Sequence, residues 1–83
     1  MSKTTFNSKT LEEQISNITA RYLNDISGDN NCDIYQRLTD ILDTTVITTT
    51  LKYTNYNQKE AATILGISRN TLRRKITLLQ IKI

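Results

Sequence analysis

The clearest structural pattern in this chain lies at Asn57–Ile76, which reads NQKEAATILGISRNTLRRKI. Its first part places Ala61, Ala62 and Leu65 on one narrow apolar face, where small residues let a second helix approach closely. Gly66 then stands where the C-terminus of a helix favours a residue that tolerates positive φ. The stretch therefore predicts two short helices joined by a tight turn.

The second of these predicted helices is strongly basic and has two different faces. Ser68 is a candidate N-cap for a helix that opens at Arg69. Leu72, Ile76 and Leu79 follow at spacings of four and three residues, which places them on one apolar seam. A helix held by one face and polar on the other is suited to the major groove of DNA. The side chains that fall away from the seam are Asn70, Arg73, Arg74 and Thr77.

The charge of the chain is divided unevenly along its length. Residues 1–50 carry four basic and seven acidic side chains, a net charge of −3, whereas residues 51–83 carry seven and one, a net charge of +6. A one-sided basic cluster is typical of a nucleic-acid binder, although a solvated basic face is the simpler alternative. Because the cluster coincides with the helix-turn-helix pattern, the sequence favours nucleic acid as the partner.

The length and composition limit the architecture and the chemistry. A chain of 83 residues forms one small domain with a limited core, and oligomerisation often compensates for this. Cys32 is the only cysteine, so no intramolecular disulfide or multi-cysteine metal site can form. With no histidine, no phosphate-binding loop and no convincing carboxylate pair, we expect no metal, no cofactor and no enzymatic activity. The sequence has no signal-peptide pattern and no membrane-spanning run, which predicts a cytoplasmic protein.

The first fifty residues predict an arm and a helix followed by a loop. Residues 1–9 are expected to form a flexible arm. Thr10 and Glu13 form a capping box at the start of the helix, and Ser27-Gly28 ends it. Its apolar stripe consists of Leu11, Ile15, Ile18, Tyr22 and Ile26.

The next segment is ambiguous between strand and helix. Asp33 is a good N-cap, but Thr44–Thr50 is rich in β-branched residues that favour a strand. Strict alternation of apolar and polar residues is absent, and no other segment reads as a strand that could pair with it. We therefore predict a helix over about residues 33–54 and an all-α fold of four helices. Its helical stripe is formed by Ile34, Leu38, Leu42, Val46, Thr50 and Tyr53, with Ile41 beside it.

These two longer helices carry more apolar surface than one short chain can bury. Pairing two chains into an intertwined dimer core would cover it and would present two basic helices to one duplex. We accordingly predict dimerisation helices at 10–56 and a helix-turn-helix unit at 57–83, with the apolar tail Leu78–Ile83 packed back on the domain. The expected dimer core consists of Leu11, Ile15, Ile18, Tyr22, Ile34, Leu38, Ile41, Leu42 and Val46.

A longer pattern of residues extends over roughly residues 10–80. Its C-terminal part is Tyr53-Thr54, Asn57-Gln58, Ala61-Ala62, Leu65-Gly66-Ile67, Arg69-Asn70-Thr71-Leu72-Arg73 and Arg74-Lys75. Its upstream part, in register without gaps, is Tyr22, Gly28, Asp33 and Tyr35. This pattern resembles the bacterial Fis family (factor for inversion stimulation).

The resemblance implies a homodimeric, nucleoid-associated transcription regulator that binds degenerate AT-centred sites in double-stranded DNA and bends them. It implies indirect readout of the uncontacted central base pairs, and it makes RNA polymerase a further candidate partner. Contacts to DNA bases are assigned by the resemblance to Arg69, Arg74 and Ser68. Contacts to the DNA backbone are assigned to Asn57, Lys59, Thr71, Arg73 and Lys75.

The chain also departs from the family pattern. Glu60 stands where a basic residue is common, Ser68 replaces the usual Asn, and the tail Thr77–Ile81 lacks the usual lysines. These departures predict weaker affinity or an altered site preference. The arm is also too short for the N-terminal β-hairpin with which the family stimulates recombinases, so we do not expect that activity.

Two other interpretations stay open at the level of sequence. The helical dimer could be an interaction protein, or the heterodimer partner of another Fis subunit, with weak DNA binding. Alternatively, Arg69–Ile83 could form a basic amphipathic helix on a membrane surface. The seam of this helix is explained more simply as the packing face of a helical hairpin.

Overall fold

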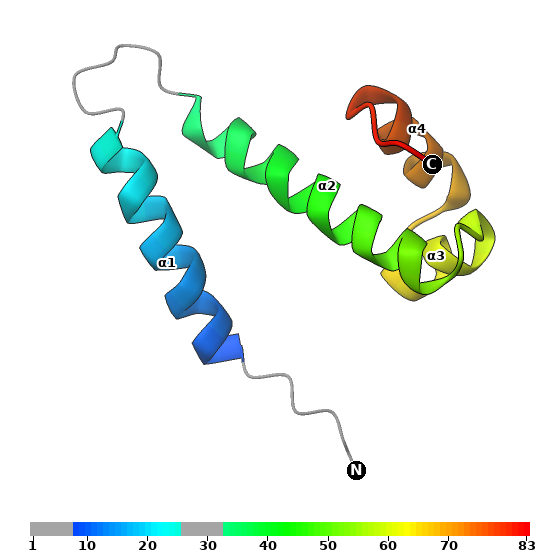
Figure 1. The fold of residues 1–83 in the computed structure, drawn as a ribbon, viewed down its shortest axis with the longest axis horizontal. Coiled ribbons are helices and arrows are strands. Elements are labelled where there is room, and N and C mark those ends of the chain that lie inside the picture. The colour runs from blue at the N-terminus through cyan, green and yellow to red at the C-terminus, as the bar shows by residue number, and fades with distance from the viewer. Residues whose placement is uncertain (1–7, 26–32) are drawn as a thin grey trace. The chain divides into compact units, whose positions relative to one another are not determined.

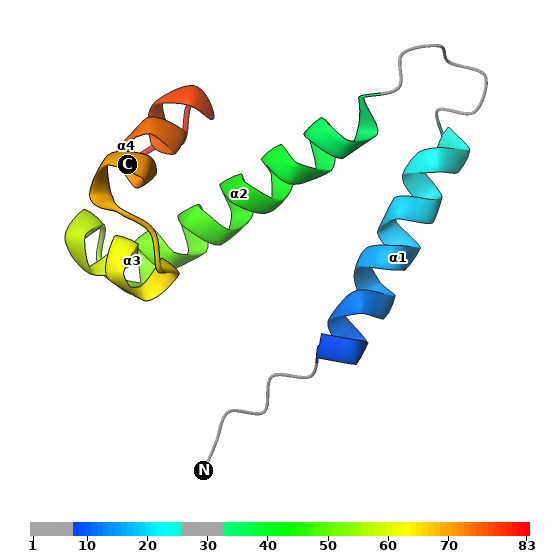
Figure 2. The ribbon, with the colours of Figure 1, turned by 180° about the vertical axis from the view of Figure 1, so that it is seen from behind.

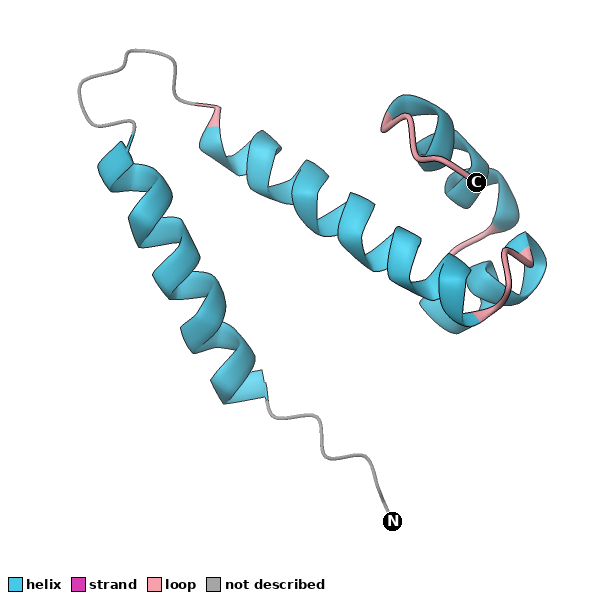
Figure 3. Cartoon of the chain, in the orientation of Figure 1, coloured by secondary structure: helices cyan, strands magenta, loops and turns pink. Residues whose placement is uncertain are grey.

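The computed structural model of the chain describes residues 8–25 and 33–83, and Figures 1 and 2 show its ribbon from both sides. Within these residues every regular element is a helix, as Figure 3 shows. The prediction of an all-α fold with four helices is confirmed. The chain divides into two compact units, Met1–Ile34 and Tyr35–Ile83. The helices are α1 (Ser8–Asp25), α2 (Ile34–Tyr53), α3 (Gln58–Leu65) and α4 (Arg69–Leu78).

The first unit contains α1, whose apolar side chains stay accessible. α1 already includes Ser8, so Thr10 lies inside the helix and is not the N-cap that the sequence predicted. No residue of α1 is buried, and Ile15 and Ile18 are each about half exposed. The predicted arm at residues 1–7 and the predicted loop at Ser27-Gly28 lie outside the described residues.

The helix α2 accommodates the β-branched run that propensity alone assigns to a strand. Each such residue costs a helix only about a few tenths of a kcal/mol relative to alanine. One threonine hydroxyl of this run also finds an acceptor inside the helix, since Thr50 Oγ1 donates to the Val46 carbonyl at 2.8 Å. Thr39 Oγ1 donates in the same way to the Tyr35 carbonyl at 2.6 Å. The predicted helix over residues 33–54 is confirmed to within one residue at each end.

The second unit has a small core to which α2, α3 and α4 all contribute. Its buried members are Ile47, Leu51, Ala61, Ala62, Leu72 and Ile76. Leu51 and Leu72 are the largest of its fully buried side chains. Ile81 packs against the same cluster, so the predicted packing of the apolar tail is confirmed at this residue, whereas Leu78 and Ile83 stay mostly exposed.

Two faces of α2 are apolar, and only one of them enters this core. At about 100° per residue, Ile47 and Leu51 lie on a different side of the helix from Leu42 and Val46. Ile47 and Leu51 are 3% and 0% exposed, whereas Leu42 and Val46 are 55% and 40% exposed. Leu42 and Val46, which belong to the stripe that the sequence predicted, therefore take no part in the buried core. The core is built on the face that the sequence analysis left out.

The turn between α2 and α3 is held by left-handed backbone without a glycine. Asn55 and Tyr56 have φ values of 55° and 66°. The Tyr56 N–H donates to the Leu51 carbonyl at 2.6 Å. The buried Thr54 hydroxyl lies 3.2 Å from the carbonyl oxygens of both Leu51 and Asn57. This hydrogen bonding fixes the path from α2 into the helical hairpin.

Candidate nucleic-acid interface

The first helix of the hairpin is capped at both ends by the residues that the sequence singled out. Asn57 is the N-cap of α3, and its side chain accepts the Glu60 N–H at 3.0 Å. Gly66 ends α3 with φ 77°, and its N–H donates to the Ala62 carbonyl at 2.9 Å. A Cβ added at Gly66 would meet nothing within 4 Å, so backbone conformation alone explains the glycine. The predicted tight turn is confirmed.

The second helix of the hairpin opens at a serine cap. Ser68 Oγ accepts the Thr71 N–H at 3.0 Å and donates to Thr71 Oγ1 at 2.9 Å. The predicted N-cap is therefore confirmed. The same bonds occupy the single hydroxyl proton of Ser68, a side chain expected to contact a DNA base. Thr71, expected to contact the DNA backbone, is its partner.

One face of α4 is packed and the other is accessible and basic. Leu72 and Ile76 are buried in the core, as the predicted seam requires, and Leu79 is half buried. The exposed residues of the helix include Arg69, Asn70, Arg73, Arg74 and Thr77. Within residues 8–25 and 33–83, none of the three arginines forms an ion pair or a side-chain hydrogen bond. Their charges are therefore available to a partner.

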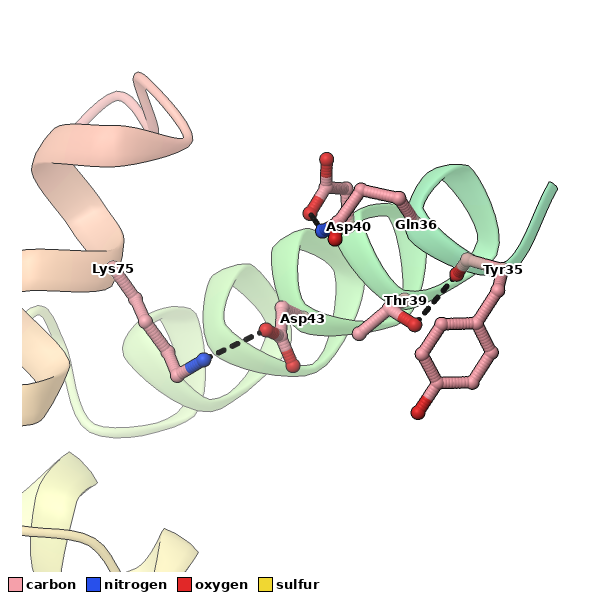
Figure 4. Close-up of polar contacts among 6 residues, drawn as sticks. All are labelled: Tyr35, Gln36, Thr39, Asp40, Asp43 and Lys75. Atoms are coloured by element: carbon pink, nitrogen blue, oxygen red, sulfur yellow. Dashed lines mark hydrogen bonds and ion pairs between the residues drawn. The ribbon is translucent and has the colours of Figure 1, made fainter. Parts of the chain in front are cut away.

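The fourth cation of α4 is already paired. Lys75 Nζ lies 2.9 Å from Asp43 Oδ2, and Figure 4 shows the lysine reaching across from α4 to α2. The side chains of Lys75 and Asp43 are 38% and 29% exposed. Asp43 is a residue that the sequence analysis did not single out. Lys75 therefore differs from Arg73, with which the resemblance grouped it as a contact to the DNA backbone.

The exposed surface of α3 carries two opposite charges. Lys59 is exposed and, in the described part of the chain, its ammonium has no ion-pair partner. Glu60 is also exposed, in the first turn of the same helix. An acidic group beside an exposed lysine reduces the local attraction for phosphate.

Other kinds of site find no support in the described residues. Residues 8–25 and 33–83 contain no group of three or more metal-binding side chains. Within the same ranges, no helix has the length and hydropathy needed to cross a bilayer.

The short hairpin, its capped turn and its basic exposed helix define a helix-turn-helix protein. The family model described as "Bacterial regulatory protein, Fis family" matches residues 40–77, which include most of α2 together with α3 and α4. No solved structure gives a significant match.

Curated relatives match most of the chain. "DNA-binding protein Fis" of Mannheimia haemolytica is 31% identical over 68 residues, which cover 82% of this chain and 69% of that protein. "Putative Fis-like DNA-binding protein" of Xylella fastidiosa (strain Temecula1) is 33% identical over 66 residues, covering 80% and 73%. A relative of the same name in Ralstonia nicotianae is 32% identical over 66 residues, covering 80% and 86%. The chain belongs to the Fis family, as its residue pattern predicted.

Proposed function

We propose that this Fis-family chain is a homodimeric protein that binds and bends double-stranded DNA and regulates transcription in the nucleoid. The observation that carries the proposal is the exposed face of α4. Arg69, Arg73 and Arg74 are accessible there, and none has a partner in the described residues. Cations placed on phosphates release condensed counterions, which drives DNA binding.

The roles of these side chains follow from their positions on α4. Arg69 is the first residue of the helix, and the N-terminal end of a recognition helix is where base edges are contacted. An arginine in that place can donate two hydrogen bonds to O6 and N7 of guanine. Arg74 is the second proposed base contact. Arg73, with Lys59 and Asn57 on the α3 side, is proposed to fix the register through phosphates.

The proposed dimer would cover the apolar face of α2 that the second unit leaves open. Leu42 and Val46 lie on that face, and Ile41 lines a shallow groove together with Leu78 and Leu79. α1 adds further accessible apolar side chains, because it has no buried residue. Of the other dimer-core candidates, Leu11, Ile15 and Ile18 are exposed, and Tyr22, Ile34 and Leu38 are half buried.

Two-fold symmetry would place two copies of α4 on one duplex. A preference for AT-centred sites would then arise from bending, because flexible central base pairs lower the deformation energy without being touched. RNA polymerase is a further candidate partner where such a site lies beside a promoter.

A salt titration of the purified full chain tests the proposal. If about 6 to 10 phosphates are contacted, affinity for duplex DNA should fall about 10³-fold or more between 50 and 200 mM salt. Arg69→Ala should remove the preference among sites while sedimentation still detects a dimer. The matched control is Arg21→Ala, an exposed arginine of α1, which should leave site preference unchanged.

Three results would refute the proposal in different ways. Binding insensitive to salt would exclude a phosphate-driven complex. Equal site preference in Arg69→Ala and in the unsubstituted chain would exclude Arg69 as a base contact. A monomer at micromolar concentration would exclude the paired arrangement and favour a heterodimer partner.

A further inference from the structure

Asn70 occupies the most outward position in the first turn of α4. The buried side of that helix is defined by Leu72 and Ile76. At about 100° per residue, Asn70 and Arg74 lie together on the opposite side, one turn apart. Both side chains are exposed. Because the Leu72 face of α4 packs on the core, Asn70 on the opposite face is accessible to any molecule that binds this helix.

Neither helix capping nor hydrogen bonding within the described residues explains the Asn70 side chain. The N-cap of α4 is Ser68, whose hydroxyl is bonded to Thr71, so Asn70 is not the cap. Within the described residues the Asn70 amide has no hydrogen-bond partner. Asparagine is also a weaker helix former than alanine, so it does not stabilise the helix interior. The amide is free, accessible and unexplained by folding.

We propose that Asn70 is a specificity-determining residue that recognises adenine in the major groove. Its carboxamide oxygen accepts a hydrogen bond from the adenine N6 amino group, and its N–H donates to adenine N7. This two-bond pairing is how asparagine distinguishes adenine from the other bases. The inference rests on the proposed DNA-binding function and adds a base contact beyond the two arginines.

The spacing along α4 restricts where this adenine lies. Asn70 follows Arg69 directly and precedes Arg74 by four residues, which is about 6 Å along the helix axis. That distance is close to two base-pair steps of about 3.4 Å each. Because Asn70 is adjacent to Arg69, the adenine should lie next to the guanine read by Arg69 within each half-site. The base contacted by Arg74 should lie about two steps from that adenine. The adenine is distinct from the AT-rich centre, which no side chain needs to touch.

The test compares Asn70→Ala with the unsubstituted chain on a panel of single-base variants of one half-site. The unsubstituted chain should prefer adenine at one position by about 5- to 150-fold over each other base. Asn70→Ala should lose that preference and keep the guanine preference and the salt dependence. Because alanine favours helix more than asparagine does, α4 should persist, which circular dichroism would check.

Adenine analogues isolate the two hydrogen bonds. Replacing that adenine by 7-deaza-adenine removes the N7 acceptor, and replacing it by purine removes the N6 donor. Each change should weaken binding of the unsubstituted chain and leave Asn70→Ala unaffected. Asn24→Ala, at an exposed asparagine of α1, is the matched control and should respond to both analogues as the unsubstituted chain does.

The outcomes separate this inference from the function on which it rests. If Asn70→Ala keeps a full adenine preference while Arg69→Ala loses the guanine preference, the assignment of Asn70 is wrong and DNA binding by α4 stands. If both variants bind and discriminate like the unsubstituted chain, α4 is not the base-reading helix. If the unsubstituted chain has no salt-dependent affinity for DNA, both proposals fail.

Discussion

The ion pair between α2 and α4 makes a prediction that separates a structural lysine from a DNA-binding one. Lys75 is expected from its family position to contact phosphate, but its Nζ lies 2.9 Å from Asp43 Oδ2. Replacing Asp43 by Asn keeps the shape and removes the charge. Replacing Lys75 by Gln removes the other charge and shortens the side chain only slightly.

The geometry and the exposure together set the size of the effect. At 2.9 Å the Coulomb energy is about 1.4 kcal/mol at the dielectric constant of water and about 6 kcal/mol at an effective value of 20. Desolvation and side-chain entropy oppose this attraction, and both side chains are about a third exposed. Measured pairs of this kind contribute about 0.2 to 1 kcal/mol. We expect a coupling of about 0.5 to 1 kcal/mol at low salt that diminishes at 1 M salt.

A double-mutant cycle measures this coupling. Urea unfolding of the unsubstituted chain, Asp43→Asn, Lys75→Gln and the double variant gives the four free energies of unfolding, all at one protein concentration. The control cycle uses Asp40→Asn. The Asp40 carboxylate accepts a hydrogen bond from the neutral Gln36 amide, one turn away, at 2.8 Å (Figure 4). The coupling of Asp40→Asn with Lys75→Gln should stay within about 0.5 kcal/mol of zero.

DNA binding supplies the second measurement. Asp43→Asn frees the ammonium for a phosphate, so the slope of log affinity against log salt should steepen by about 0.9 for each copy of α4 bound. Lys75→Gln alone should change the slope little. The reasoning is refuted if the coupling is zero and Lys75→Gln flattens the slope by about 0.9, because Lys75 would then already be bound to phosphate.

Two further pairs of substitutions test the two faces of α2 and the left-handed residues of the two turns. Leu51→Ala should lower the free energy of unfolding in urea by about 2 to 5 kcal/mol, because Leu51 is fully buried. Leu42→Ala, on the exposed face, should instead weaken self-association measured by sedimentation. Equal losses of unfolding free energy in the two variants would contradict a helix with one buried and one exposed apolar face. Tyr56→Gly should raise the free energy of unfolding by about 0.5 to 1 kcal/mol, since φ of 66° strains a residue with a Cβ. Gly66→Ala should lower it by about 1 kcal/mol, and the opposite signs would refute the strain argument.

Local patterns predicted the helical hairpin because its signals are themselves local. The cap at Ser68, the left-handed turn at Gly66 and the seam of Leu72 and Ile76 each depend on residues within one or two turns. The helical state of Thr44–Thr50 was also predictable, because no other segment of the sequence could pair with it as a strand.

Features that depend on distant partners could not be predicted in this way. Asp43 and Lys75 are 32 residues apart, so no spacing rule connects them. The apolar stripe predicted for α2 followed the Leu42 face and left out Ile47 and Leu51, because a helix with two apolar faces has no single hydrophobic periodicity. The helix start predicted at Thr10 was wrong for a different reason: the residue types of a capping box can occur at the same spacing inside a helix.

The contribution of α2 to the core determines which fragment of this chain could be transferred to another protein. A fragment cut at the start of the hairpin would carry α3 and α4 but leave behind Ile47 and Leu51. Leu72 would then lose two members of the cluster in which it is buried. The smallest transplantable unit therefore begins near Tyr35, at the boundary of the compact unit. Any fusion that inherits α4 in this setting would inherit the exposed Leu42 face as well, and with it the surface proposed here for the dimer contact.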